Sequence, residues 1–188
     1  MPVFLNSSSP RKSGKYSVTW ILLVSLIIVF PALSDERREH SLKAAFIANL
    51  SRFVEWSGDK STDKQSKINI CILGEGTFAD AAMSYNHENL SKSGFFVIEK
   101  NISNIASHCH ILFINQSETV RLESIISSLK GKQILTVGDS EDFSKRGVML
   151  GALVEDGRVK FIVNKQAIAD SGLYIDSSFL ELAYKVIR

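Results

Sequence analysis

The sequence has little excess charge of either sign. Its 188 residues carry a formal net charge of +2, and three of the basic residues, Arg11, Lys12 and Lys15, lie in an N-terminal segment that we expect to be removed. Without them, 22 − 3 = 19 basic residues face 20 acidic residues, which is a net charge of −1. A nucleic-acid partner requires a basic stripe, so the sequence does not suggest one.

Motifs of common enzyme classes are also missing. No serine stands in a G-x-S-x-G elbow. Gly74-Glu75-Gly76 follows a predicted strand, but Ala79 replaces the third glycine of a dinucleotide fingerprint, and the lysine of a P-loop is absent. Asp139, Glu141 and Asp142 form a carboxylate cluster that could belong to an active site, although an ordinary loop is the preferred interpretation. We therefore expect no catalytic residues and no cofactor.

The sequence has only two cysteines, Cys71 and Cys109. In an exported protein an even count favours a disulfide, and two buried, unpaired thiols are the alternative. His108-Cys109-His110 also resembles a zinc-binding segment. In a strand, however, His108 and His110 would point to one side and Cys109 to the other, so we expect no metal site.

The N-terminus has the pattern of an export signal. A nearly unbroken apolar run from Val18 to Phe30 follows the three basic residues, and Ala32-Leu33-Ser34 supplies small residues for a signal peptidase. This pattern predicts a signal peptide, residues 1–34, cleaved after Ser34. An uncleaved anchor is the alternative, but the run is shorter than the roughly 20 residues that a spanning helix needs. Residues 35–188 then suffice for one domain.

The stretch Ser41–Trp56 is predicted to form an amphipathic helix, because its apolar residues recur at spacings of three and four. Lys43 falls mostly off the apolar side. Asn49 lies on it, so we expect its amide to bond a neighbouring loop. Phe53 and Trp56, at the helix end, are either core residues or an exposed anchor for a partner.

The remaining pattern predicts an α/β fold. Four apolar, β-branched segments alternate with helices, which favours parallel βαβ units. A helix from Ser117 to Leu129 carries Val120 on its inner side. Glu155-Asp156-Gly157 predicts an antiparallel hairpin, and Ser178 to Glu181 has capping-box spacing that opens a last helix reaching Ile187. The predicted strands span residues 68–73, 95–99, 110–114, 133–137, 148–154 and 158–163.

Several segments together resemble the YfiR family. The resemblance rests on Leu42–Ile47, Asn49, Arg52–Trp56, Cys71–Gly74, Cys109–Ile114, Ile134–Asp139, Phe143, Gly147–Leu150, Arg158–Asn164, Ala167, Gly172-Leu173, Ile175, Ser177, Leu180, Leu182 and Ala183. Their order and spacing hold over nearly the whole chain after the signal. The chain departs from the family pattern at Ser57, Val148, Ile162 and Asp176.

The resemblance implies a periplasmic regulator rather than a catalyst. YfiR-like proteins bind the periplasmic region of an inner-membrane diguanylate cyclase and hold it inactive, and an outer-membrane lipoprotein can draw the repressor away. The output is cyclic di-GMP, and hence biofilm formation. A homodimer is expected from the family.

For this chain we therefore expect a mixed, mostly parallel sheet flanked by helices, with Cys71 and Cys109 bridging two of its strands. Arg52, Phe53, Glu55 and Trp56 are the candidate partner-binding residues. Two alternatives remain. One is a small-molecule sensor with a pocket near Gly74–Gly76 and Gly138-Asp139, and the other is a hydrolase that uses Asp139 to Asp142.

Overall fold

The structure is a computed structural model, and it describes residues 30–56, 68–88 and 94–188. The chain divides into two units, residues 1–35 and 36–188, and the fold below is that of the second. Helix α2 (Phe30–Asn49) runs from one unit into the other. Most of the predicted signal peptide lies outside the described residues, so its cleavage stays a prediction.

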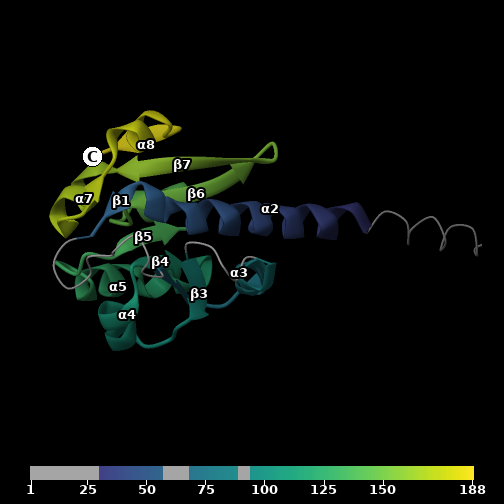
Figure 1. The fold of residues 1–188 in the computed structure, drawn as a ribbon, viewed down its shortest axis with the longest axis horizontal. Coiled ribbons are helices and arrows are strands. Elements are labelled where there is room, and N and C mark those ends of the chain that lie inside the picture. The colour runs from purple at the N-terminus through teal and green to yellow at the C-terminus, as the bar shows by residue number, and fades with distance from the viewer. Residues whose placement is uncertain (1–29, 57–67, 89–93) are drawn as a thin grey trace, which may run out of the picture. The chain divides into compact units, whose positions relative to one another are not determined.

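The second unit is built on a mixed sheet with the strand order β3-β2-β4-β5-β6-β7-β9 (Figure 1). The first five are parallel, β6 and β7 pair antiparallel, and β9 pairs parallel to β7. This confirms the predicted α/β class. The strands span Ile68–Leu73 (β2), Gly94–Ile98 (β3), Ile111–Ile114 (β4), Leu135–Gly138 (β5), Leu150–Glu155 (β6), Arg158–Asn164 (β7) and Lys185–Ile187 (β9).

The hairpin between β6 and β7 forms as the Asp-Gly pair predicts. Asp156 has φ 53° and Gly157 has φ 68°. Two successive positive φ values match the twist of a tight hairpin, and aspartate and glycine tolerate them better than most residues.

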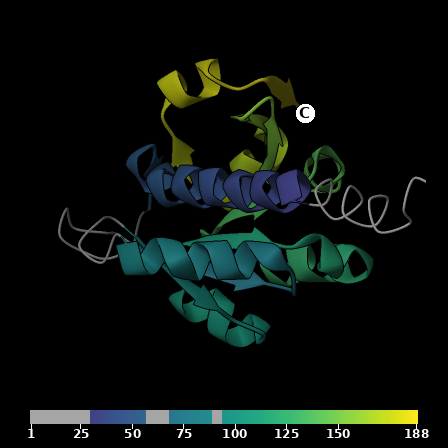
Figure 2. The ribbon, with the colours of Figure 1, turned by 90° about the vertical axis from the view of Figure 1, so that its right-hand side faces the viewer.

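Helices cover both faces of the sheet. On one face, α2 and α3 (Thr77–Glu88) lie side by side and bury Ile47 and Phe78 against Ile70 and Phe113 (Figure 2). On the other face, α4 (Ile102–His108), α5 (Leu122–Ser128) and α6 (Glu141–Lys145) cover a second cluster around Leu112. Because successive strand residues point to opposite faces, the apolar runs read in the sequence supply both clusters.

The predicted helix Ser41–Trp56 ends earlier than expected. Helix α2 stops at Asn49, a 3₁₀ turn η1 (Leu50–Arg52) follows, and Val54-Glu55 forms strand β1. Strand β1 pairs antiparallel with β8 (Tyr174–Ile175), so that Val54 lies opposite Ile175. The pairing with a segment 121 positions away outweighs the local helical spacing, because it buries Val54 and satisfies its backbone.

Two polar residues of α2 also differ from expectation. Asn49 does not bond a loop, because its Nδ2 donates to the carbonyl of Ala45 within the helix at 2.7 Å. Lys43 was expected off the packing face, yet it is only 3% exposed. Its burial depends on an acidic partner far along the chain, which helical periodicity alone does not reveal.

The segment after β4 is less regular than the predicted helix Ser117–Leu129. Asn115 caps a 3₁₀ helix η3 (Gln116–Arg121), and α5 begins only at Leu122. Val120 was expected on the inner side and is 92% exposed. A 3₁₀ turn has three residues per turn instead of 3.6, so the inward face moves away from this residue.

The C-terminus corrects another expectation. After α7 (Lys165–Ser171) and β8, helix α8 covers only Ser177–Glu181, and β9 follows instead of a continuing helix. Asp176, rather than Ser178, accepts the capping bond, from the Ser178 amide at 2.7 Å. Strand β9 then pairs with the edge of β7. This pairing depends on the position of β7 in the folded sheet, which the local sequence does not reveal.

Candidate partner-binding surface and the edges of the sheet

Cys71 and Cys109 form a disulfide in the structure, with their Cα atoms 5.8 Å apart. Cys71 lies in β2, but Cys109 is the C-cap residue of α4 and is separated from β4 by His110. The bridge therefore ties a strand to the end of a helix, and not two strands as expected. Both cysteines are buried.

The two histidines beside Cys109 do not converge on a metal site. His108 ends α4, and its Nδ1 lies 2.8 Å from the hydroxyl of Ser107. Nδ1 of His110 accepts a hydrogen bond from the backbone amide of Asn69. Within the described ranges, no group of three or more His, Cys, Asp or Glu residues could hold a metal ion.

The carboxyl ends of β2 and β4 form the point where doubly wound sheets bind their ligands. Here the loops meet closely. A Cβ at Gly74 would lie 2.6 Å from the hydroxyl oxygen of Ser117, and one at Gly76 would lie 2.8 Å from Nδ2 of Asn115. Both glycines have positive φ, 102° and 153°, which favours glycine. The two glycines are therefore required by the tight turn after β2, which is the role that we prefer from the sequence.

A hollow of about 350 Å³ remains beside these loops. The charged side chains around it neutralise one another. Lys100 lies 3.6 Å from Glu75, and Arg121 lies 2.6 Å from Glu118. The predicted pocket at this edge thus holds ion pairs instead of converging unpaired charges.

Lys43 of α2 reaches the same edge of the sheet. Its ammonium, with the side chain 4% exposed, pairs with the carboxylate of Asp139, which follows β5 directly, and lies 4.0 Å from Glu39. Asp139 is thus engaged in holding α2 across the strand ends. A buried charge needs such a partner, because leaving water costs free energy.

The neighbouring carboxylates are also paired. Glu141 lies 2.7 Å from Lys185 and 3.1 Å from Lys145. Hydrogen bonds from Lys185 and then Lys145 lower the pKa of Glu141. Asp142 contacts Arg146 at 3.4 Å. Each carboxylate of this cluster is therefore held in an ion pair with a lysine or an arginine.

Thr77 of α3 and His40 form a further polar contact of α2, with the hydroxyl 2.7 Å from Nε2. A hydroxyl beside an imidazole resembles a nucleophile and its base. In a catalytic triad, however, an acid holds Nδ1, and Nδ1 of His40 is buried without a hydrogen-bond partner among the described residues. Glu36 lies instead on the Nε2 side, at 3.7 Å.

The four candidate partner-binding residues divide into two pairs. Trp56 is 6% exposed, with its ring edge-on to His110 at 5.7 Å, and Phe53 is partly buried. Their aromatic rings belong to the core. Arg52 and Glu55 are exposed, so only these two present side chains that a partner could reach readily.

The fold brings a further residue to the two exposed ones. Glu55 lies opposite Tyr174 in the β1–β8 pair, and Tyr174 is 60% exposed. We call Arg52, Glu55 and Tyr174 the β1–β8 surface. No sequence signal pointed to Tyr174, because the strand pair joins segments distant in the chain.

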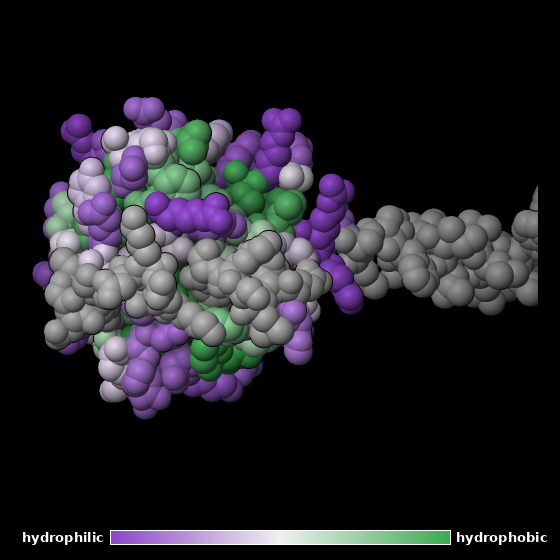
Figure 3. Space-filling model, in the orientation of Figure 1, coloured by the Kyte–Doolittle hydropathy of each residue, from purple (hydrophilic) through white to green (hydrophobic). Residues whose placement is uncertain are grey.

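Phe53, which lies between Arg52 and the start of β1, packs against aromatic rings of the core. Phe53 contacts Phe179 with ring centroids 5.1 Å apart, and Phe179 stacks on Phe161 at 4.4 Å. Leu182 and Val186, 68% and 43% exposed, add apolar groups in the C-terminal segment. Figure 3 shows apolar groups at the surface of the C-terminal elements, at the top of the view, bordered by hydrophilic ones.

The family model described as YfiR/HmsC-like matches residues 40–184. The chain belongs to the YfiR/HmsC-like family. Members of this family are periplasmic regulators of cyclic di-GMP signalling, regulatory rather than catalytic. None of the helices in the described part of the chain is long and apolar enough to span a membrane. No curated protein matches the chain.

Two solved structures share the fold of this YfiR/HmsC-like protein. A conserved domain protein from Vibrio cholerae O1 biovar eltor has a TM-score of 0.50 and 11% identity, with 79% of this chain and 60% of that chain covered. The ABC domain in complex with L-Trp from Streptococcus pneumonia has a TM-score of 0.50 and 12% identity, with 79% and 62% covered. The chain therefore spans less than two thirds of each, and the likeness concerns the fold alone.

Proposed function

We propose that this protein represses an inner-membrane diguanylate cyclase by binding its periplasmic region, and so controls cyclic di-GMP and biofilm formation. Membership of the YfiR/HmsC-like family carries the proposal. The repressor would act by binding the inactive state of the cyclase more tightly than the active state, which shifts the population between them. An outer-membrane lipoprotein would relieve repression by competing for the same protein.

The β1–β8 surface is the proposed contact site. Tyrosine and arginine are enriched at protein interfaces and among the residues that dominate binding energy. Arg52 in η1 and Tyr174 in β8 supply these residue types as exposed side chains, and Phe53, next to Arg52, packs against the ring of Phe179. A rigid support of this kind loses little conformational entropy when a partner binds.

Co-purification of the protein with membranes that contain the cyclase tests the proposal. We expect the cyclase to be retained, and its output of cyclic di-GMP to fall when the protein is present. Tyr174→Ala should weaken retention by more than tenfold, as for an interface hot spot. Val120→Ala, at a residue 92% exposed on η3, is the control and should leave retention unchanged.

Two results would contradict the proposal. If no diguanylate cyclase is retained, repression by direct contact is wrong. If the cyclase is retained equally by Tyr174→Ala and the unchanged protein, the contact lies elsewhere and only the assigned surface is wrong.

Export and self-association belong to the same proposal. Periplasmic action requires a signal, and N-terminal sequencing of the exported protein should give Asp35 as the first residue. Light scattering of the purified protein should give twice the mass of the processed chain if the family's homodimer forms. A start before residue 35, or a monomer at all concentrations, would contradict these two points separately.

A further inference from the structure

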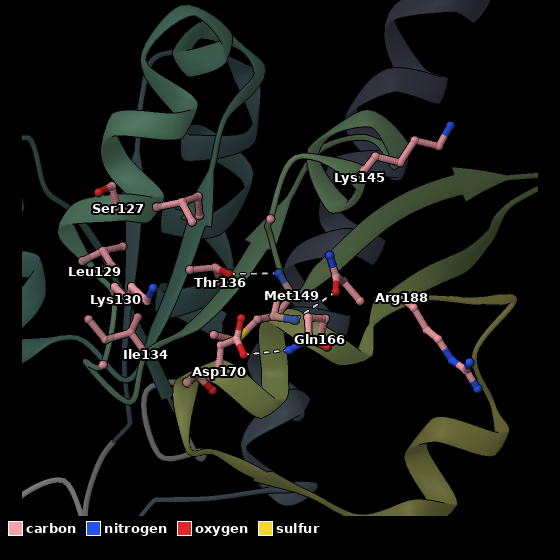
Figure 4. Close-up of a pocket in the computed structure, with 16 residues that line it drawn as sticks. Ser127, Leu129, Lys130, Ile134, Thr136, Lys145, Met149, Gln166, Asp170 and Arg188 are labelled. Atoms are coloured by element: carbon pink, nitrogen blue, oxygen red, sulfur yellow. Dashed lines mark hydrogen bonds between the residues drawn. The ribbon is translucent and has the colours of Figure 1, made fainter.

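A cavity of about 360 Å³ that has no assigned role lies on the side of β5 opposite its carboxyl end (Figure 4). It lies between the end of α5, the segments that lead into β5 and β6, and α7. This is a different place from the strand ends where the sequence suggested a pocket. The volume is at the lower end of the roughly 300–1,000 Å³ typical of small-molecule sites.

The body of the cavity is apolar. Ile126 and Leu129 of the α5 segment, Ile134 before β5, Met149 before β6 and Ala167 of α7 line it. Burial of an apolar group against these side chains is favourable, because it removes apolar surface from water. The cavity therefore favours a ligand with an apolar body.

The polar groups on the α7 side already have partners. The carboxylate of Asp170 accepts a bond from Nε2 of Gln166 at 2.8 Å. Asn164 donates to the carbonyl of Ser144 and accepts from the amide of Ala167. Figure 4 shows Asp170 and Gln166 bonded to each other beside Met149. These hydrogen bonds stabilise the α7 side of the cavity.

The groups near the end of α5 are donors that remain unused. The buried Thr136 hydroxyl accepts from the amide of Met149 at 3.0 Å, which leaves its proton to donate. The ammonium of Lys130 has no carboxylate within 4.0 Å, and the hydroxyl of Ser127 forms no hydrogen bond, among the described residues. In Figure 4, Lys145 and Arg188 extend away from the cavity.

We propose that this cavity binds a small monocarboxylate with an apolar body. Its carboxylate accepts hydrogen bonds at the α5 side from Lys130 and Thr136. Its apolar part lies against Ile134 and Met149. Charge-assisted bonds of this kind are stronger than neutral ones, so the anionic head group distinguishes this ligand from a neutral or cationic analogue.

Titration of the ¹⁵N-labelled protein by NMR with hexanoate, 1-hexanol and hexylamine tests the proposal. These probes share a six-carbon chain and differ in head group. Hexanoate should shift the amide signals of Lys130, Thr136, Met149 and Ala167, and bind at least tenfold more tightly than the other two. Absence of shifts at these amides with millimolar hexanoate, or equal binding of hexylamine or 1-hexanol, would overturn the proposal.

Two variants and a control locate the site. Lys130→Gln should weaken hexanoate binding about tenfold, which is the loss expected for one hydrogen bond to a charged group. Lys132→Gln removes the same charge from an exposed residue that does not line the cavity, and should have no effect. Ala167→Leu should block the cavity and abolish binding. Equal affinity in Lys130→Gln and Lys132→Gln would refute the assigned head-group site.

The titration contains no cyclase and no lipoprotein. Its failure would therefore leave the repression proposal standing, and failure to retain a cyclase would leave the cavity proposal standing.

Discussion

Breaking the ion pair between Lys43 and Asp139 should destabilise the protein more than removing a charge from an ion pair at the surface. The Lys43 side chain is 4% exposed and the Asp139 side chain 14% exposed. Lys43→Met replaces the cation with an apolar chain of similar length and leaves the carboxylate of Asp139 without it. Asp139→Asn leaves the buried ammonium with only Glu39, at 4.0 Å.

The expected magnitude follows from burial. Removing one partner of a buried ion pair costs about 3–5 kcal/mol, because the other charge is left uncompensated. Asp139 keeps some contact with water, so we expect about 3 kcal/mol for Lys43→Met. At about 2–4 °C for each kcal/mol in a domain of this size, the melting temperature should fall by roughly 6–12 °C.

Urea unfolding of the single variants and of the double variant measures this effect. The double variant should cost at least about 2 kcal/mol less than the sum of the single variants, because it removes both charges. Lys100→Ala, in a pair whose side chains are 81% and 85% exposed, is the control and should cost less than about 1 kcal/mol. Strictly additive costs, or a cost for Lys43→Met no larger than the control, would refute this reasoning.

Three further predictions concern other parts of the fold. Replacing Cys71 and Cys109 by alanine should lower the free energy of unfolding by about 4 kcal/mol for a separation of 38 residues, whereas an unchanged urea midpoint would show that the bridge is not formed. Gly74→Ala should cost about 1–3 kcal/mol more than Gly131→Ala, because both have positive φ but only the first Cβ meets other atoms; equal midpoints would contradict the close approach. The pKa of Glu141 is lowered from its ordinary value of 4.5, so its contribution to stability is present above that pH and is lost as pH falls through the lower folded value. Glu141→Gln should therefore flatten the acid side of the stability curve below pH 4.5, and parallel curves for the two proteins would count against this effect.

The predictable parts of the fold were those whose signal is local. Ile68–Leu73 and Ile111–Ile114 are buried on both faces, so a short apolar run marks each strand without knowledge of its neighbours. The turn at Asp156-Gly157 needs positive φ values that few residues tolerate. Family membership was also visible, because its motifs are spread along one chain in a fixed order.

The predictions from sequence were wrong at residues whose conformation or burial depends on a segment far along the chain. Val54 leaves the helical pattern to pair with Ile175, and Val186 leaves it to lie beside Val163 in β7. The burial of Lys43 depends on Asp139, 96 positions later. No periodicity within α2 distinguishes a lysine with a buried acidic partner from one in water.

Local apolar patterns and turn residues were enough to predict the α/β class, the parallel strands and the hairpin, and motifs in a fixed order were enough to recognise the family. Which of the candidate residues are accessible depends on the folded arrangement. It placed Trp56 in the core, brought Tyr174 beside Glu55, filled the predicted strand-end pocket with ion pairs, and formed a second cavity at the end of α5. Accessibility and convergence depend on which segments meet in space, and free energies of packing and strand pairing between distant residues decide that.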